Sequence, residues 1–246
     1  GGMEEGLNAT SQILKVRGRV IPSTLENIQL QAEMSDGTIV SGESKIPEAR
    51  KRIRKMLMKP ADAPASKGAI EAILKSDVLI FGPGSLYTSV IPNLLVEEIR
   101  EAILQSDAVK IYVCNVMTQP GETDGYGAFE HVRALVDHMG KQFLDYVIVN
   151  DQKITTEQLK QYYAEGSMPV TPDVEKIRKL GITVVPASLI SKDDLVRHDP
   201  RKLARALIML IYRLRLFGKG VQFFDYIFMR HGLNTMDKDV RGNFKK

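Results

Sequence analysis

An apolar strand pattern in this chain runs directly into a turn rich in glycine, hydroxyl and amide groups. It occurs twice, as VLIFGPGSLYTSVIPN at 78–93 and as IYVCNVMTQPGET at 111–123. Isoleucine, leucine and valine with few flanking charges are typical of strands buried on both faces of a parallel sheet. Open α/β sheets bind ligands along the carboxyl edge of their strands. We therefore expect both turns to lie on one binding edge.

The segments around these turns alternate between strand and helix patterns, which predicts a Rossmann-like, doubly wound α/β fold with a mostly parallel sheet. Strands are expected at 78–81, 110–114, 146–150 and 182–186, and helices at 8–14, 68–75, 94–104, 128–139, 156–164 and 174–180. Gly140 is expected to end its helix in the left-handed conformation. Thr155 and Gln158 suit a capping box, and Asp173 suits the N-cap of the helix at 174–180.

Antiparallel structure is expected before this alternation begins. Apolar and polar residues alternate up to Met34, a Ser35-Asp36-Gly37 turn follows, and residues 38–44 return. This pattern predicts an antiparallel hairpin insert. A further β-rich segment is expected at 16–22 and an extended piece at 52–58.

Composition is that of an ordinary globular protein: 246 residues, 43% hydrophobic and 26% charged, with a formal net charge of +4. Because lysine and arginine are spread along the chain rather than clustered, we expect no nucleic-acid partner. Cys114 is the only cysteine and lies in an apolar run, which fits a reducing compartment. No secretory leader pattern opens the chain. These features predict a cytoplasmic protein.

The carboxyl-terminal part carries a helical stripe of leucine, isoleucine and phenylalanine at 203–217, flanked by arginines. Two interpretations remain open: a helix that packs on the sheet or on another subunit, and a basic amphipathic helix that lies on a membrane. Charges interrupt the stripe too often for a membrane span. We expect a homo-oligomer without membrane insertion, divided into an α/β domain at 1–207 and an apolar helical tail at 208–246.

The first turn has the composition of a phosphate cradle. Gly82 and Gly84 permit positive φ and close backbone approach to a ligand. The hydroxyls of Ser85, Thr88 and Ser89 follow near a helix start, where backbone amides bind anions. An ordinary strand-to-helix turn would explain the glycines equally well, because neither a GxGxxG fingerprint nor a Walker loop is present.

The second turn gathers amide, hydroxyl and carboxylate groups after a buried strand. Asn115 and Thr118 can hydrogen-bond a base or a ribose. Glu122 or Asp124 can bind ribose hydroxyls or a Mg²⁺ ion shared with phosphates. The alternative is that Thr123 or Asp124 only caps the following helix. Together the two turns favour a phosphorylated ligand such as a sugar nucleotide.

Three histidines are candidate functional groups. His198 lies beside Asp199 at a helix start, where it acts either as a proton shuttle or as a capping or surface group. His131 and His138 are seven residues apart on one helix, which exceeds the spacing for one shared metal ion. We expect both of these to be structural or exposed.

The two turns lead to a family resemblance. GPGSLYTSVIPNLL and CNVMTQPGETDGY closely resemble signature segments of the CofD-like superfamily, in its gluconeogenesis factor (YvcK-like) branch. The resemblance continues through SGESKIP, DHMG and DLVRHDP and covers roughly residues 14–207. Members of this family begin with a strand and a GGGTG-type loop, followed by a DDGGS-like motif. Neither motif occurs in this sequence, which therefore resembles the carboxyl-terminal part of a family member, with half of the phosphate cradle missing.

The resemblance implies a set of nucleotide- and phosphate-binding residues. These are Gly82, Gly84, Ser85, Tyr87 and Thr88 in the first turn, Asn115, Thr118, Gln119 and Glu122 in the second, and Arg197 and His198 in VRHDP. An arginine suits a diphosphate because its planar guanidinium makes paired, charge-assisted hydrogen bonds.

Two functions are implied by the resemblance. The bacterial branch is associated with binding UDP-sugars and with cell shape and envelope growth on gluconeogenic carbon sources. The superfamily's enzyme transfers a phospholactyl-type group from a guanosine-linked donor to a deazaflavin during coenzyme F420 biosynthesis. Because no nucleophile or base is evident, we expect a UDP-sugar-binding protein rather than a transferase. The only cofactor considered is Mg²⁺ accompanying a nucleotide, held by Glu122 or Asp124.

Overall fold

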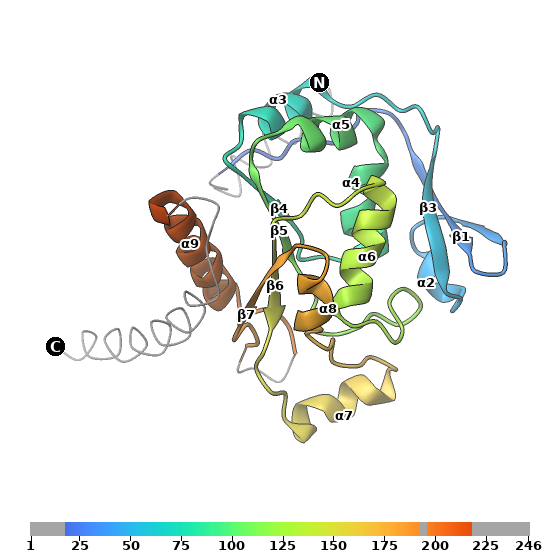
Figure 1. Ribbon diagram of the computed structural model, residues 1–246. Coiled ribbons are helices and arrows are strands. Elements are labelled where there is room, and N and C mark those ends of the chain that lie inside the picture. The colour runs from blue at the N-terminus through green and yellow to red at the C-terminus, as the bar shows by residue number, and fades with distance from the viewer. Residues whose placement is uncertain (1–17, 192–195, 218–246) are drawn as a thin grey trace.

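The computed structural model describes residues 18–191 and 196–217 (Figure 1). Strands β4, β5, β6 and β7 form a parallel sheet in that order, and β2, β1 and β3 form an antiparallel sheet. The strands are β1 Gln29–Met34, β2 Ile39–Ser41, β3 Ile53–Lys59, β4 Val78–Phe81, β5 Val109–Val113, β6 Tyr146–Asn150 and β7 Thr183–Ala187. The helices are α2 Lys45–Glu48, α3 Lys67–Lys75, the π-helix η1 Leu86–Val90, α4 Ile91–Leu95, α5 Glu97–Gln105, α6 Ala128–Met139, α7 Thr156–Ala164, α8 Val174–Arg178 and α9 Pro200–Phe217.

The parallel sheet is covered on both faces, which explains why its strands are almost continuously apolar. Successive strand residues point to opposite faces, so Tyr112 packs in one core while its neighbours Ile111 and Val113 pack in the other. Figure 1 shows α4 and α6 on one side of this sheet and α9 on the opposite side. The expected doubly wound α/β fold is therefore confirmed.

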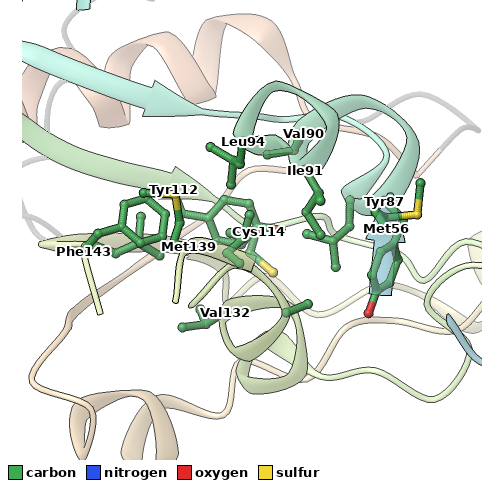
Figure 2. Close-up of a cluster of buried hydrophobic side chains, with 14 of the residues drawn as sticks. Met56, Tyr87, Val90, Ile91, Leu94, Tyr112, Cys114, Val132, Met139 and Phe143 are labelled. Carbon is green, nitrogen blue, oxygen red and sulfur yellow. The ribbon is translucent and has the colours of Figure 1, made fainter. Parts of the chain in front are cut away.

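The larger core lies between the sheet and the helices α4 and α6. In Figure 2, Ile91 and Leu94 of α4 face Val132 and Met139 of α6, with Tyr112 of β5 between them. Tyr112 is fully buried. This packing fixes α4 and α6 against β5, whose end leads into the second turn.

The antiparallel hairpin is confirmed. Ala32 of β1 pairs with Val40 of β2, and the Gly37 amide donates to the Met34 carbonyl across the turn at 2.9 Å. The extended piece expected at 52–58 is β3, which joins β1 as a third antiparallel strand. By contrast, the prediction of a β-rich segment at 16–22 is wrong for residues 18–22, the part of it that the structure describes, because these residues form no strand. The helix expected at 8–14 lies outside the described residues.

The helix expected at 94–104 is divided between two shorter elements, α4 and α5. The π-helix η1 begins at Leu86, directly after the glycine turn, and α4 follows it. Val96 then adopts an extended conformation and separates α4 from α5, while its side chain is almost completely buried. The helical spacing of apolar residues did not reveal this break between α4 and α5, because Val96 is buried as a helical core residue would be.

Asp173 occupies the N-cap position of α8, as expected, but its side chain makes no capping hydrogen bond there. Its carboxylate instead accepts a hydrogen bond from the Phe129 amide in the first turn of α6, at 3.4 Å, and pairs with Lys176 at 2.9 Å. Gly127 makes room for it, because a Cβ at Gly127 would lie 1.9 Å from the Asp173 carboxylate. Asp173 therefore joins the start of α6 to α8.

Helix α9 packs on the sheet through Leu203, Ala206 and Leu210, as one interpretation of the tail predicted. Its outer side exposes Ile208 and Tyr212. No helix within 18–191 and 196–217 is both long and apolar enough to cross a membrane. Since α9 runs across residue 207 and residues 218–246 lie outside the described part, the expected division of the chain at this point stays a prediction.

Candidate functional site

The glycine turn after β4 lies directly against the end of β5. Gly82 has φ near +80°, and a Cβ at this position would lie 3.1 Å from the Val113 carbonyl oxygen. Both the left-handed conformation and the close approach favour glycine. The Ser85 carbonyl then accepts from the amides of Ser89 and Val90, which opens η1. The backbone at 82–85 is thereby fixed beside the end of β5.

Glu122 holds the two turns together. Its carboxylate accepts hydrogen bonds from the Thr88 hydroxyl at 2.9 Å, the Gln119 side-chain amide at 2.8 Å and the Tyr87 backbone amide at 3.3 Å. The side chain is 3% exposed, and this burial raises the pKa of Glu122 against the opposing effect of the Thr88 and Tyr87 hydrogen bonds. Glu122 therefore positions one turn against the other.

Thr118, in the second turn, forms hydrogen bonds with Met168 rather than with the first turn. Its amide donates to the Met168 carbonyl at 2.7 Å, and its hydroxyl accepts from the Met168 amide at 2.8 Å. Met117 forms a neighbouring β-bridge with Pro169. These contacts fasten the second turn to the segment that follows α7.

The proposed helix-capping role of Thr123 or Asp124 is wrong. Gly127 is the N-cap of α6, and its amide donates to the Glu130 carboxylate at 2.8 Å. Thr123 accepts from the Gln119 amide at 2.8 Å, and Asp124 accepts from the Gly121 amide at 2.7 Å. Both side chains therefore brace the second turn itself.

His198 reaches the end of β5 from the segment before α9. Its Nε2 lies 3.2 Å from the Cys114 carbonyl oxygen. Because a carbonyl oxygen can only accept, Nε2 carries the proton and donates, which leaves Nδ1 as the acceptor nitrogen of the neutral ring. Burial lowers the pKa of His198, which favours the neutral ring. Arg197 precedes it and is exposed. The next residue after Cys114 is Asn115, whose buried Oδ1 has no hydrogen-bond partner within the part of the chain that the structure describes.

The structure thus divides the predicted site residues into two groups. Those at the open ends of β4 and β5 or beside them are Gly82, Gly84, Ser85, Asn115, Arg197 and His198. Those whose side chains are engaged within or behind the turns are Tyr87, Thr88, Thr118, Gln119 and Glu122. The second group fixes the position of the first.

A preformed metal centre is not found in the described ranges, where no three His, Cys, Asp or Glu side chains gather closely enough to hold an ion. Of the two expected ligands, Glu122 is buried in its hydrogen-bond network and Asp124 is exposed. Mg²⁺ bound together with a nucleotide stays a prediction, since phosphate oxygens would supply part of the coordination.

Two residues at this edge were missed by the sequence reading. Asn150, at the end of β6, accepts from the Leu189 amide at 3.2 Å and so joins the ends of β6 and β7. An amide directly after an apolar strand, the pattern that selected Asn115, could have found it. The Tyr162 hydroxyl accepts from the Val196 amide at 2.8 Å and holds the residue before Arg197. No local signal reveals this contact, because its partners are 34 residues apart.

Pockets lie on both sides of the strand ends. One of about 520 Å³ follows β4 and includes Gly82, Gly84 and Ser89 in its wall. Another of about 330 Å³ lies beyond Asn150, between apolar walls that include Val116. The turn residues therefore occupy the middle of a longer edge that offers space at either end.

Comparison with known proteins shows the family. The sequence model of the family described as "2-phospho-L-lactate transferase CofD" matches residues 1–190. The chain belongs to this family. Two curated relatives are named gluconeogenesis factor. The one from Halalkalibacterium halodurans is 44% identical over 209 residues, covering 85% of this chain and 65% of the relative. The one from Bacillus subtilis is 42% identical over 212 residues, covering 86% and 67%.

A solved structure agrees with this assignment. The crystal structure of a UPF0052 family member from Bacillus halodurans matches with a TM-score of 0.80 and 44% identity over 83% of this chain and 66% of that chain. The expected membership of the CofD-like superfamily, with relatives in the gluconeogenesis factor branch, is confirmed. The chain spans about two thirds of the length of these relatives.

Proposed function

We propose that this chain is the sugar-nucleotide-binding part of a cytoplasmic gluconeogenesis factor. It binds the diphosphate of a UDP-sugar at the ends of β4 and β5 and thereby links carbon metabolism to cell shape and cell-wall growth. The observation that carries the proposal is the close approach of the Gly82 turn to the end of β5, held by Glu122. This contact makes one surface from two turns that are far apart in the sequence.

The groups at this surface fit a diphosphate joined to a sugar. The Arg197 guanidinium suits the diphosphate, because it presents several donors in one plane. Neutral His198 offers Nδ1 as an acceptor, which suits a sugar hydroxyl better than a phosphate oxygen. Asn115 follows the end of β5 beside this surface, and its buried side-chain oxygen lacks a hydrogen-bond partner among the described residues.

The dimensions support an extended ligand. Neighbouring strands of a sheet are about 4.8 Å apart, so the ends of β4 and β6 are separated by about 10 Å. A diphosphate at the middle strand end would leave its two substituents near the pockets at Gly84 and at Asn150. This arrangement fits a nucleoside diphosphate that carries a sugar at its other end.

A transferase remains the second candidate, because the matching family is described by that activity. In this reaction a phospholactyl-type group would move from a nucleotide-linked donor to a deazaflavin acceptor. The geometry gives it less support, since Glu122, one of the two expected Mg²⁺ ligands, is held by three donors from the turns. Mass spectrometry after incubation with GTP- or UDP-linked donors, Mg²⁺ and a deazaflavin tests it, and a transfer product would replace the binding proposal.

Isothermal titration calorimetry with UDP-N-acetylglucosamine tests the binding proposal. We expect saturable heat with one equivalent of ligand, and weaker binding of UMP and of free N-acetylglucosamine, each of which lacks the diphosphate. Absence of saturable heat at millimolar UDP-N-acetylglucosamine would contradict the proposal. Equal affinity for UMP would contradict the assigned role of the diphosphate.

A further inference from the structure

A second recess lies behind the turns, between β3 and α6. Its volume is about 210 Å³, and its wall includes Arg52 and Arg54 from the start of β3 and Arg133 from α6. The rings of Tyr87 and Tyr126 also line it. Three guanidinium groups from two elements therefore surround a space that the proposed sugar-nucleotide edge does not use.

The wall of this recess carries three arginines and two acids, Glu130 and Asp137. Arg54 pairs with Glu33 across the antiparallel sheet. Arg52 and Arg133 form no ion pair with a carboxylate of the described residues, whereas Asp137 is the acidic side chain left beside them. The remaining acid of the wall, Glu130, accepts the Gly127 amide at the start of α6. Arg52 and Arg133 therefore face Asp137 and Glu130 at equal formal charge, so selectivity for an anion must come from the directed N–H and O–H donors of the recess rather than from a net positive charge.

Arg133 is oriented by an aromatic ring. Its guanidinium carbon lies 5.9 Å from the centre of the Phe129 ring. A guanidinium stacked in this way keeps N–H groups at its edge for a ligand. Such groups make paired hydrogen bonds to phosphate oxygens.

The two phenols supply a hydrogen-bond donor. The hydroxyl oxygens of Tyr87 and Tyr126 are 2.8 Å apart, so one phenol proton lies between them. The second proton has no acceptor among the residues the structure describes. Burial raises the pKa of Tyr87, so its hydroxyl stays protonated at neutral pH. Figure 2 shows this hydroxyl directed away from the apolar cluster around Ile91.

The recess is also preformed. His138 donates from Nδ1 to the Ala134 carbonyl at 2.6 Å and accepts from the Met56 amide at Nε2 at 2.9 Å. Both ring nitrogens are therefore occupied, and the ring ties the backbone of β3 to α6. This agrees with the structural role expected for His138 and holds Arg52 opposite Arg133 without a ligand.

We propose that this recess binds a small phosphate-class oxyanion through Arg52, Arg133 and the unpaired proton of the Tyr87–Tyr126 pair. The site is distinct from the strand-end edge, because the Tyr87 amide faces Glu122 while its hydroxyl faces Tyr126. The oxyanion is either free phosphate or the phosphate group of a small metabolite. Neither source depends on the UDP-sugar proposal.

Calorimetric titration of the whole chain with inorganic phosphate and, separately, with glucose 6-phosphate tests this site. The proteins are wild type, Arg52→Ala, Arg133→Ala and Tyr126→Phe, with Arg100→Ala as the control because Arg100 pairs with Glu97 on α5. We expect phosphate binding to weaken about tenfold in each arginine variant and several-fold in Tyr126→Phe. Arg100→Ala should bind as wild type does, and circular dichroism should show equal folding.

The outcomes separate the alternatives. Tighter binding of glucose 6-phosphate than of phosphate identifies a phosphorylated metabolite, and equal binding identifies free phosphate; both support the site. Dissociation constants unchanged in Arg52→Ala and Arg133→Ala would overturn it. A loss of phosphate binding in Arg197→Ala instead would overturn it too, since the anion would then occupy the strand-end edge.

Discussion

The Glu122 carboxylate, in the turn after β5, accepts a hydrogen bond at 2.9 Å from the Thr88 hydroxyl, in the turn after β4. The same carboxylate holds the Tyr87 amide. Buried donors that lose their acceptor are costly, so this one side chain controls how the two turns meet.

Replacement of Glu122 tests the connection between the turns. Glu122→Ala leaves the Thr88 hydroxyl and the Tyr87 amide without an acceptor, and we expect the free energy of unfolding to fall by about 1–3 kcal/mol. Glu122→Gln keeps one acceptor oxygen and should lose less. Urea denaturation measures both changes, with Glu101→Ala on the exposed side of α5 as the control. A Glu122→Ala protein as stable as this control would show that the contact does not stabilise the turns.

Gly82 and Gly181 form a matched pair, since both have φ near +80° but only Gly82 faces a nearby atom, the Val113 carbonyl oxygen. Alanine at either site should cost about 1–2 kcal/mol of backbone strain. Gly82→Ala should also weaken binding of UDP-N-acetylglucosamine, whereas Gly181→Ala should leave it unchanged. Calorimetry measures the dissociation constant of UDP-N-acetylglucosamine for both variants, and so separates a local effect at the Gly82 turn from a general effect of backbone strain. Equal affinities in the two variants would argue against the Gly82 turn as part of the site.

Arg197→Ala tests the diphosphate contact. Loss of charge-assisted hydrogen bonds should weaken UDP-N-acetylglucosamine about tenfold. The change should be small for UMP, which has a single phosphate. Arg201→Ala, an exposed arginine at the start of α9, serves as the control. An Arg197→Ala protein with wild-type affinity would remove Arg197 from the site.

His138 predicts a pH dependence of stability. Burial lowers the pKa of His138 in the folded protein below its usual 6.5, so the unfolded chain binds the proton more readily. The contribution of His138 to the free energy of unfolding is fully present above pH 6.5, the pKa in the unfolded chain. It is lost as the pH falls from 6.5 through the lower pKa of the folded protein. Protonation also removes the acceptor of the Met56 amide. We expect the free energy of unfolding to decrease from pH 7.5 to 5.5.

His138→Gln separates this residue from the other buried histidines. Burial also lowers the pKa values of His131 and His198, which remain in the variant. Denaturation of both proteins at each pH should therefore give a smaller decrease for His138→Gln than for wild type. Parallel pH profiles would mean that His138 contributes nothing to the effect.

Elements defined by local patterns could be predicted from the sequence. The strand Val78–Phe81 and the helix Ala128–Met139 have the expected limits. Gly140 ends that helix in the left-handed conformation, as its position indicated. Apolar runs, helical periodicity and cap residues all act within a few residues, so one sequence suffices to recognise them.

Contacts between distant segments could not be predicted in this way. Glu122 was selected as a ligand for metal or ribose, yet it binds Thr88, 34 residues earlier. Asp173 was selected as a cap for α8, yet it accepts from Phe129, 44 residues away, in a space left by Gly127. The local sequence pattern selected these polar side chains, whereas their hydrogen-bond partners depend on how distant segments pack.

A crystal structure of this chain with UDP-N-acetylglucosamine would show where the diphosphate binds. We predict that the diphosphate lies within hydrogen-bond distance of the backbone at Gly84 and Ser85 and of the Asn115 side chain, with Arg197 beside it. Density for the diphosphate away from these strand ends, whether in the recess between Arg52 and Arg133 or on the outer face of α9, would contradict it.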